Sequence, residues 1–369
     1  MAQMPLAKSF SQLLKQALAP LGRPRQCALL NYPNHMNIGD HLIWAGTIDY
    51  LQNVSQTRIV YAADLDSHSE PILNLVLSPA DPILLHGGGS LGDLWPERQE
   101  FHERVVAAYP KRPIFLLPQS MHFRDPARAR RAAEIFNAHG ELTLFIRDQH
   151  SHAGASKLFT NCQVHLAPDM AFQMAGYLSP IAPAAGPTLL LSRRDHEALR
   201  PSPMLGIDGI HQDWVSLERK WRWGHRAIPF SRTLACWYRE SWQRRFLRSG
   251  EYRLRMAWLD QLRASPATSA LVTGPGCEFS LGLIWDGCHQ LSSHRALVTD
   301  RLHAHLLAAM LGIPSVLRPN SYAKNKSFHE TWLSNISWCR FVEDEAAVPQ
   351  SLAEVIAVKP GGANGFEQW

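Results

Sequence analysis

Short apolar runs alternate with longer stretches of helical periodicity along most of this chain. Continuous apolar runs are typical of strands that are buried on both faces of a parallel sheet. In the first half, these runs are Cys27–Tyr32, Thr57–Ala62, Pro82–His86, Pro113–Leu117 and Leu142–Ile146. Helical periodicity lies between them at His41–Gln52, Arg98–Ala108 and Pro126–His139. Strands that alternate with helices in this way predict an α/β fold.

A stretch rich in proline and alanine, Pro180–Pro187, interrupts the alternation, which then resumes with expected strands at Thr188–Ser192, Ala296–Thr299 and Ser315–Leu317 and a helix at Leu302–Leu311. A chain of 369 residues is longer than one core usually supports. We therefore predict two Rossmann-like domains with a cleft between them at the carboxyl ends of the strands. The expected divisions are an N-terminal helix (1–22), a first domain (23–180), a hinge (181–187), a second domain (188–345), and a C-terminal helix and tail (346–369).

The second expected domain contains a basic helical insertion. Segment 217–263 has 12 arginines or lysines against 4 acidic residues, and it contains five of the 12 tryptophans of the chain. Such a segment can lie against anionic lipid headgroups or an anionic glycan. It can equally be a solvated insertion whose tryptophans pack on the parent domain. We keep both interpretations open.

The composition favours a cytoplasmic protein. No apolar stretch is long enough to span a membrane, and Lys8 and Lys15 interrupt any apolar segment of a secretion signal. The six cysteines form no CxxC pair, which indicates free thiols instead of disulfides or a zinc site. We expect no metal ion and no nucleic-acid partner. Peripheral contact with the inner face of the plasma membrane through 217–263 stays an open alternative.

The glycine-rich loop His86–Asp93 directly follows an expected strand. Its glycines match GxGxxG, but the next strand is not followed by the acidic residue that a nicotinamide enzyme uses to bind ribose. The loop also matches GxSxG around Ser90, yet a hydrolase keeps its nucleophile and its oxyanion loop on separate segments. A tight strand-to-helix turn without a ligand is one remaining interpretation. We favour a cradle for an anion or a sugar, formed by His86, Gly87, Gly88 and Gly89.

Two further motifs lie where expected strands end. In Asn37-Ile38-Gly39-Asp40, the polar side chains either cap a helix or face the cleft. In Thr299-Asp300-Arg301-Leu302-His303, an arginine and a histidine stand at the start of a helix, where the helix dipole favours anions. Arg301 offers a fork for phosphate or carboxylate, and His303 can exchange a proton near neutral pH. Other residues that could converge on the same cleft are Arg147, Asp169, Arg193, Arg194, Lys324 and Lys326.

Taken together, these motifs resemble the polysaccharide pyruvyl transferase family over roughly residues 28–335. The resemblance rests on Asn37–Asp40, His86–Gly89, Pro118-Gln119-Ser120, Arg147-Asp148, Ala167-Pro168-Asp169, Thr299–His303, Gly312-Ile313-Pro314 and Lys324-Asn325-Lys326. It implies a fold like the GT-B glycosyltransferases. It also implies transfer of the enolpyruvyl group of phosphoenolpyruvate onto a sugar, which gives a cyclic pyruvate ketal and phosphate. The acceptor would be a sugar of a bacterial exopolysaccharide or of its lipid-linked repeat unit.

The resemblance also assigns roles to residues. The family's Arg-Leu-His triplet, which is implicated in phosphoenolpyruvate binding, falls on Arg301, Leu302 and His303. The remaining donor-binding candidates are Arg193, Arg194, Lys324 and Lys326. We expect His303 to be the general acid or the partner of the leaving phosphate, and Asp40 to be the base for the attacking hydroxyl. The expected acceptor-binding residues are Asn37, Gly39, Asp40, His86, Gly87, Gly88, Gly89, Gln119 and Asp169. No cofactor other than the donor substrate is expected.

Two other classes of protein fit parts of the pattern. A nucleotide-sugar glycosyltransferase would use the same architecture and the same cationic helix start for a diphosphate. A non-catalytic, membrane-associated scaffold of polysaccharide assembly would account for the basic, tryptophan-rich segment. Binding of a nucleotide sugar would favour the first class, and failure to bind any small anion would favour the second.

Overall fold

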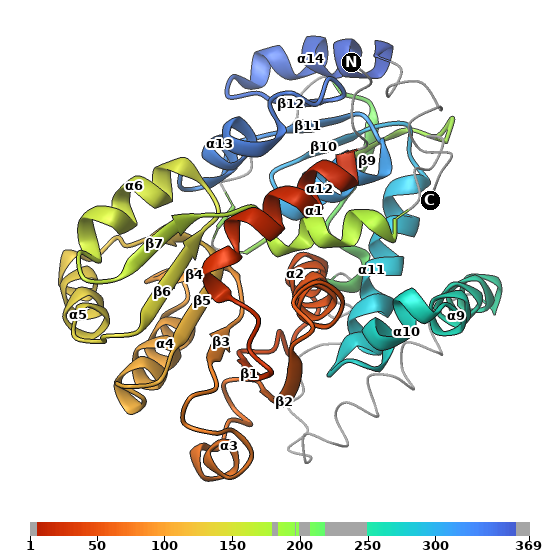
Figure 1. Cartoon of the computed structure of the whole chain (residues 1–369). Helices are drawn as coiled ribbons and strands as arrows, with labels where there is room; N and C mark the ends of the chain where they lie inside the picture. The colour runs from red at the N-terminus through yellow and green to blue at the C-terminus, as the bar shows by residue number, and fades with distance from the viewer. Residues whose placement is uncertain (1–5, 179–183, 196, 199–206, 218–248, 359–369) are drawn as a thin grey trace, which may run out of the picture.

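Two parallel β-sheets with surrounding helices form the molecule, which is known from a computed structural model (Figure 1). The structure describes residues 6–178, 184–195, 197–198, 207–217 and 249–358. The expected α/β class is therefore confirmed. Residues 181–183 of the expected hinge and residues 218–248 of the basic segment lie outside the described residues. Among the described residues, no helix is long and apolar enough to cross a membrane.

The first sheet comes from the N-terminal half, in the order β2-β1-β3-β5-β6-β7, with β4 paired to β5. All its pairings are parallel. Its strands are β1 (Gln26–Leu30), β2 (Arg58–Ala63), β3 (Ile83–Leu85), β4 (Gly88–Gly92), β5 (Ile114–His122), β6 (Leu142–Ile146) and β7 (Gln163–Leu166). The central strands β1, β3 and β6 are almost wholly buried, as their apolar sequences predicted.

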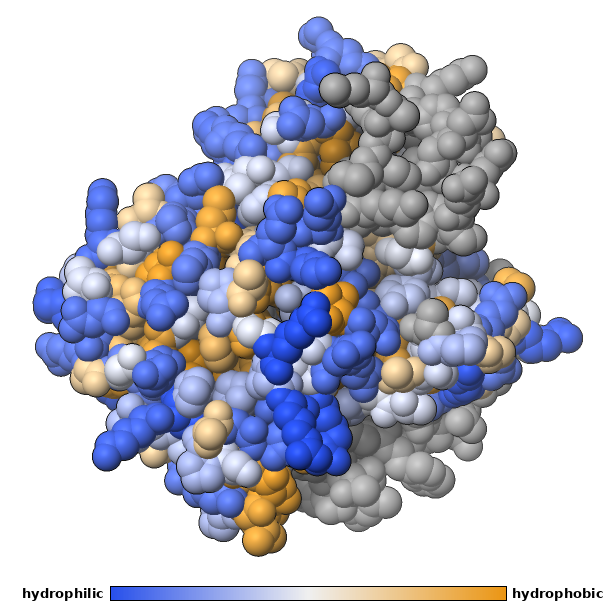
Figure 2. All heavy atoms as spheres, viewed as in Figure 1, coloured by the Kyte–Doolittle hydropathy of each residue, from blue (hydrophilic) through white to orange (hydrophobic). Residues whose placement is uncertain are grey.

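Helices connect these strands and cover the sheet. They are α1 (Leu6–Ala17), α2 (Ile38–Asp49), α3 (Glu70–Val76), α4 (Pro96–Ala108), α5 (Pro126–Asn137) and α6 (Gln149–Leu158), with shorter helical turns at η1 (Ala19–Leu21), η2 (Tyr50–Val54) and η3 (Met170–Gly176). Helix α3 lies at the lower edge of the molecule, where Figure 2 shows an apolar patch. The exposed side chains of this patch are Ile72, Leu75 and Val76.

The second sheet is formed by the C-terminal half in the order β12-β11-β10-β8-β9, again with parallel pairings. Its strands are β8 (Thr188–Leu191), β9 (Gly209–Gln212), β10 (Leu297–Thr299), β11 (Ser315–Leu317) and β12 (Cys339–Phe341). Its helices are α9 (Ser249–Ala264), α10 (Pro266–Thr273), α11 (Cys277–Ser292), α12 (Leu302–Leu311), α13 (Lys324–Phe328) and α14 (Val348–Ala357), with turns at η4 (His329–Leu333) and η5 (Glu345–Ala347). The described end of the basic segment is helix α9.

One hydrophobic core extends across both sheets. Leu29 of β1 and Leu297 of β10 belong to the same cluster of buried side chains. Helix α2 lies at the centre of this cluster, and the indole of its buried Trp44 donates a hydrogen bond to the Pro275 carbonyl at 2.7 Å. Helix α1 closes the cluster through Phe10, whose ring stacks on Phe172 with centroids 3.7 Å apart. The two halves are therefore joined by apolar packing.

The glycine-rich loop differs from the expected strand-to-helix turn. Gly88–Gly92 forms strand β4, which lies alongside the end of β5, with Gly88 opposite Gln119 and Gly92 opposite His122. No helix begins within the loop, since α4 starts only at Pro96. The alternative interpretation, a tight turn into a helix, is therefore wrong, because glycines that look like turn residues here complete a parallel pairing.

Candidate active site

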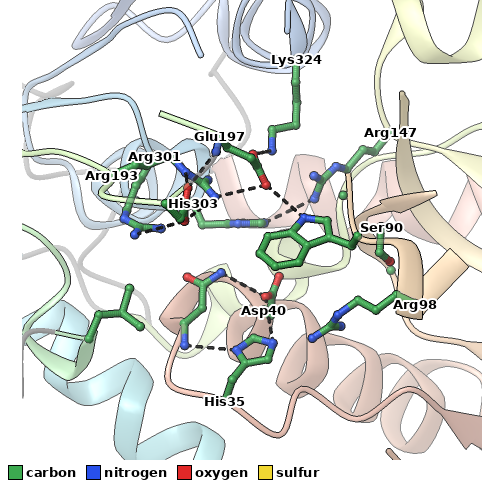
Figure 3. A pocket seen from close by; sticks show the side chains of 16 residues that line it. His35, Asp40, Ser90, Arg98, Arg147, Arg193, Glu197, Arg301, His303 and Lys324 are labelled. Carbon is green, nitrogen blue, oxygen red and sulfur yellow. Dashed lines mark hydrogen bonds and ion pairs between the residues drawn. The ribbon is translucent and has the colours of Figure 1, made fainter. Parts of the chain in front are cut away.

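A cavity of about 270 Å³ lies where the carboxyl ends of strands from both sheets converge. The side chains that line it come from segments after β1, β3, β6, β8 and β10 and from the starts of α4 and α13 (Figure 3). Its described lining residues are His35, Asn37, Asp40, Gly87, Gly89, Ser90, Trp95, Arg98, Arg147, Arg193, Asp195, Glu197, Leu217, Arg301, His303 and Lys324. Five arginine or lysine side chains thus face three carboxylates. This arrangement favours an anionic ligand.

The start of α12 contributes Arg301 and His303. Arg301 is the N-cap residue of this helix, and its backbone N–H donates to the Thr299 hydroxyl at 3.0 Å. The guanidinium makes a bidentate pair with Asp213, with Nε–Oδ1 at 2.5 Å and Nη2–Oδ2 at 2.8 Å. Asp213 follows β9, which is separated from β10 by β8, so the pairings of β8 with both strands place the carboxylate that orients Arg301. Arg301 therefore enters the cavity in a fixed orientation.

His303 is positioned by residues of the first sheet. A Cβ atom on Gly39 would lie 2.4 Å from Nδ1 of His303, so the imidazole packs directly against the glycine at the start of α2. The other ring nitrogen, Nε2, lies 3.5 Å from Asp169 Oδ2 and 3.4 Å from Arg147 Nη1. The imidazole is thus clamped between two helix starts and a buried ion pair. Such clamping is what a side chain that transfers protons requires.

That ion pair, Arg147 with Asp169, is almost fully buried. Arg147 Nη1 lies 2.5 Å from Asp169 Oδ2, and Arg147 Nε donates to the Ser120 hydroxyl at 3.0 Å. Asp169 also accepts from the Ala171 N–H at 2.8 Å as the N-cap of η3. Burial alone would raise the pKa of Asp169, but Arg147 and His303 lower it well below its usual range. Asp169 therefore stays ionised behind the cavity wall.

Glu197 is the carboxylate on which donors from both halves of the molecule converge. Its Oε2 accepts from Lys324 Nζ at 2.7 Å and from the Tyr322 hydroxyl at 3.4 Å. Its Oε1 lies 3.1 Å from Arg193 Nη2 and accepts from the Trp95 indole at 3.2 Å. Burial raises the pKa of Glu197, but Lys324 and Arg193 outweigh that effect and lower it to about 2. Glu197 thereby links α4 to the cations of the second sheet.

Asp40 lies on the opposite side of the cavity, in the first turn of α2. Its Oδ2 accepts from the Asn37 amide at 3.0 Å and lies 3.3 Å from His35 Nε2. The Asn37 N–H donates to His35 Nδ1 at 3.3 Å, which leaves Nε2 to donate to Asp40. Burial raises the pKa of Asp40, but the charges of His35, Arg98 and His303 lower it well below its usual range. Asp40 is therefore an ionised hydrogen-bond acceptor.

The glycine-rich segment leaves room for this cluster. A Cβ atom on Gly89 would make van der Waals contact with Arg147 Nη2 at 3.4 Å and with Lys324 Nζ at 3.5 Å, so the backbone of Gly89 lies directly beside these cations. Gln119 supports the segment from behind by donating to the His86 carbonyl at 2.7 Å and accepting from the Ser90 N–H at 3.2 Å. Burial lowers the pKa of His86 to about 3, so this histidine is neutral.

The structure brings together most, but not all, of the residues predicted for the site. Asn37, Asp40, Gly87, Gly89, Arg193, Arg301, His303 and Lys324 line the cavity, whereas Gly39, His86, Gly88, Gln119 and Asp169 support it from behind. Leu302 is buried in the core. Arg194 is exposed and does not line the cavity. Lys326 is an exposed residue that pairs with Glu343 at 2.9 Å, because it lies on the outer side of the short helix α13.

Several lining residues were missed by the sequence analysis. His35, Trp95, Arg98, Asp195 and Glu197 were not among the candidates. The charged run after Thr188–Leu191 could have pointed to Asp195 and Glu197, because they follow Arg193 at the same strand end. No local pattern distinguishes Arg98 from the other arginines of its helix. Within the described residues, no cluster of histidine, cysteine or acidic side chains could hold a metal ion.

Comparisons with known proteins agree on one family. Residues 37–322 match the family model described as polysaccharide pyruvyl transferase. The Bacillus subtilis protein named "Putative pyruvyl transferase EpsO" is 28% identical over 338 residues, which cover 91% of this chain and 94% of the relative. Pyruvyl transferase 1 of Schizosaccharomyces pombe is 26% identical over 84% of this chain and 70% of the relative.

A solved structure supports the fold independently. A functionally uncharacterised protein from Klebsiella pneumoniae superimposes with a TM-score of 0.54 at 16% identity, covering 91% of this chain and 99% of that protein. At this identity the likeness concerns the fold alone. The family match includes the lining residues from Asn37 to His303 and all the motifs on which the resemblance was based except Lys324-Asn325-Lys326. The chain therefore belongs to the polysaccharide pyruvyl transferase family, and it is a transferase.

Proposed function

We propose that this protein transfers the enolpyruvyl group of phosphoenolpyruvate to two hydroxyls of one sugar and forms a cyclic pyruvate ketal. The observation that supports this proposal most is the excess of cationic side chains around His303 in the cavity. Phosphoenolpyruvate combines a phosphate with a carboxylate, so several cations and a helix start are suited to bind it. Arg193, Arg301 and Lys324 are the donor-binding candidates that line the cavity.

The proposed reaction adds one proton to the donor and removes two from the acceptor. A proton goes to C3, which becomes a methyl group, and C2 becomes an electrophile. One sugar oxygen forms a bond to C2, the second oxygen follows, and the C2–O bond to phosphate breaks. The second proton leaves with the phosphate. His303 is the general acid at C3 or the partner of the departing phosphate. Its Nε2 lies 3.4 Å from Nη1 of Arg147, which holds the imidazole in the cavity.

Asp40 is the proposed partner of the attacking hydroxyl. Its low pKa makes it a weak base, so it orients the hydroxyl as an acceptor and takes the proton only as the new C–O bond forms. Asn37 and Gly87 lie in the same part of the cavity and are proposed to contact the sugar. The absence of a side chain at Gly89, beside Arg147 and Lys324, supports a sugar position next to the cations that are proposed to bind the donor.

The cellular setting is also part of the proposal. The two sheets are proposed to be the cores of two Rossmann-like domains in a GT-B-like arrangement, with the donor on the side of the second sheet. The acceptor is proposed to be a sugar of a bacterial exopolysaccharide or of its lipid-linked repeat unit, modified in the cytoplasm. Segment 217–263 would then contact the inner face of the plasma membrane. Co-sedimentation with anionic vesicles tests that contact, and absence of binding would contradict it.

The first experiment measures the unfolding temperature of the purified protein with phosphoenolpyruvate, pyruvate, phosphate, and UDP- and GDP-sugars. A ligand that binds the folded state selectively raises this temperature. We expect phosphoenolpyruvate to give the largest shift. A shift with a nucleotide sugar alone would overturn the proposal and favour a glycosyltransferase. Turnover is then measured in two ways: by the amount of phosphate released and by the change in mass of a candidate oligosaccharide.

Two neighbouring lysines provide a matched pair of variants. Lys324 lines the cavity, whereas Lys326 is exposed and lies outside it. We expect Lys324→Met to lower phosphoenolpyruvate binding by about 10-fold or more, because a charge-assisted hydrogen bond contributes roughly 1.5–3 kcal/mol. Lys326→Met should leave binding unchanged. Equal losses in both variants would show that the cavity is not the donor site.

His303→Ala should abolish turnover while the protein remains folded.

A further inference from the structure

Most cations of the cavity are already paired with a carboxylate of the protein. Arg147 pairs with Asp169 at 2.5 Å and Lys324 with Glu197 at 2.7 Å. Likewise, Arg193 pairs with Asp195 at 2.9 Å and Arg301 with Asp213 at 2.5 Å. These pairs neutralise much of the charge that a ligand would otherwise meet. A cavity cation that has no carboxylate partner is therefore the one best suited to bind an anionic ligand.

Among the described residues, that cation is Arg98, in the first turn of α4. No carboxylate lies within 4.0 Å of its guanidinium, and its hydrogen-bond partner is the side-chain oxygen of Asn31 at 3.5 Å from Nη1. Arg98 lines the cavity next to Ser90 and lies across it from Arg193 and Arg301 (Figure 3). Its charge lowers the pKa of Asp40, but among the described residues no carboxylate forms an ion pair with the guanidinium, so its N–H groups can bind a ligand.

Buried residues behind Arg98 hold it in this orientation. Asn31 is fully buried directly after β1, and its backbone has a φ of 68°, a left-handed conformation that asparagine adopts more readily than most other residues with a side chain. The side-chain amide of Asn31 also contacts Nε2 of His102 at 3.3 Å. His102 is fully buried and stands four residues after Arg98, on the same face of α4.

We propose that Arg98 binds an oxyanion of the donor, its carboxylate or its phosphate, from the side of the first sheet. This inference rests on the proposed function and extends it, because the donor then lies between the starts of α4 and α12 instead of contacting the second sheet alone. A guanidinium without a carboxylate partner gains a full charge-assisted hydrogen bond when the anion arrives. Asn31 is a positioning residue that acts through Arg98.

The test is calorimetric titration of phosphoenolpyruvate into Arg98 variants without any acceptor. We expect Arg98→Gln to weaken binding by about 10- to 100-fold and Arg98→Lys to weaken it less, because lysine keeps the charge but loses the fork. Arg104→Gln is the matched control, since Arg104 is exposed on the same helix. Unchanged binding of phosphoenolpyruvate by Arg98→Gln would overturn the proposal.

A second variant addresses the positioning network. Asn31→Gly keeps the left-handed backbone without strain but removes the amide that contacts Arg98. We expect a higher KM for phosphoenolpyruvate with little change in kcat, whereas a merely structural role would change the unfolding temperature and leave KM unaltered. Failure of the wild-type protein to bind phosphoenolpyruvate would overturn the proposed function itself. If the wild type binds phosphoenolpyruvate and Arg98→Gln binds it equally well, only the role of Arg98 is overturned.

Discussion

The position of the His303 imidazole requires a glycine at position 39. A Cβ atom there would lie 2.4 Å from Nδ1 of His303, closer than any real contact allows. We predict that Gly39→Ala displaces the imidazole and lowers kcat by about 100-fold, the loss that a misplacement of roughly 1 Å can cause. Overpacking should cost about 1–3 kcal/mol of the free energy of unfolding. Activity assays and urea unfolding measure the two effects.

Gly140 provides the control for that substitution. It is exposed at the end of the α5–β6 connection, and a Cβ atom there meets nothing within 4 Å. Gly140→Ala should therefore leave activity unchanged. If Gly39→Ala kept wild-type kcat, His303 would not need its observed position, and its proposed role in proton transfer would be contradicted.

The lowered pKa of Glu197 predicts that the free energy of unfolding depends on pH. Its pKa is lowered from 4.5 to about 2 by Lys324 and Arg193, which outweigh the opposing effect of burial. A folded-state pKa below the unfolded value stabilises the protein above pH 4.5, and this stabilisation is lost as the pH falls towards 2. We predict that Glu197→Gln lowers the free energy of unfolding at pH 6 and that the difference from wild type shrinks as the pH falls.

Urea unfolding at a series of pH values measures this difference. The exposed residue Glu134 of α5 is the control, and Glu134→Gln should follow the wild-type curve at every pH. A gap between Glu197→Gln and wild type that stays constant from pH 6 down to pH 3 would contradict the prediction. It would mean that Glu197 contributes packing and not charge.

At the scale of elements, the apolar runs predicted the central strands well. The strands Leu142–Ile146 and Ser315–Leu317 and the helix Leu302–Leu311 have the same bounds in sequence and structure. Each of these segments is buried over nearly its whole length, so its apolar composition directly reflects its position in the fold. Apart from β5, the other expected strands were shifted by a residue or two, as at β1 and β3.

Elements formed by polar or glycine-rich residues could not be predicted in the same way. Strand β5 was expected to end at Leu117, yet it continues through Gln119 to His122 because β4 pairs along this extension. Gln119 makes the extension possible by bridging His86 and Ser90 with its side chain. Such a strand forms because it pairs with a segment that is distant in the sequence, and local composition does not reveal that partner.

The candidate site shows the same distinction between local and long-range signals. Asp40 and His303 were found because they belong to compact motifs at strand ends. Arg98 was missed because its role depends on Asn31, 67 residues earlier in the chain. Glu197 was missed because its donors come from Trp95, 102 residues before it, and from Lys324, 127 residues after it.

For the whole molecule, the shared core has a thermodynamic consequence. Leu29 of the first sheet and Leu297 of the second belong to one cluster of buried side chains, and α2 packs within it. Two halves joined by a small polar interface would unfold separately, but halves that share a core lose their packing together. The cavity residues that follow strands of the two sheets are therefore held in one cooperative unit.

We predict a single unfolding transition that both leucines stabilise. Leu29→Ala and Leu297→Ala should each lower the free energy of unfolding by about 2–5 kcal/mol, the usual cost of truncating a buried leucine. Leu75→Ala is the control, because Leu75 is 84% exposed on α3. Far-UV circular dichroism and tryptophan fluorescence should give coincident curves for all three variants. Two resolved transitions, each shifted by one leucine variant alone, would show that the sheets unfold independently and that the cavity can open without loss of either core.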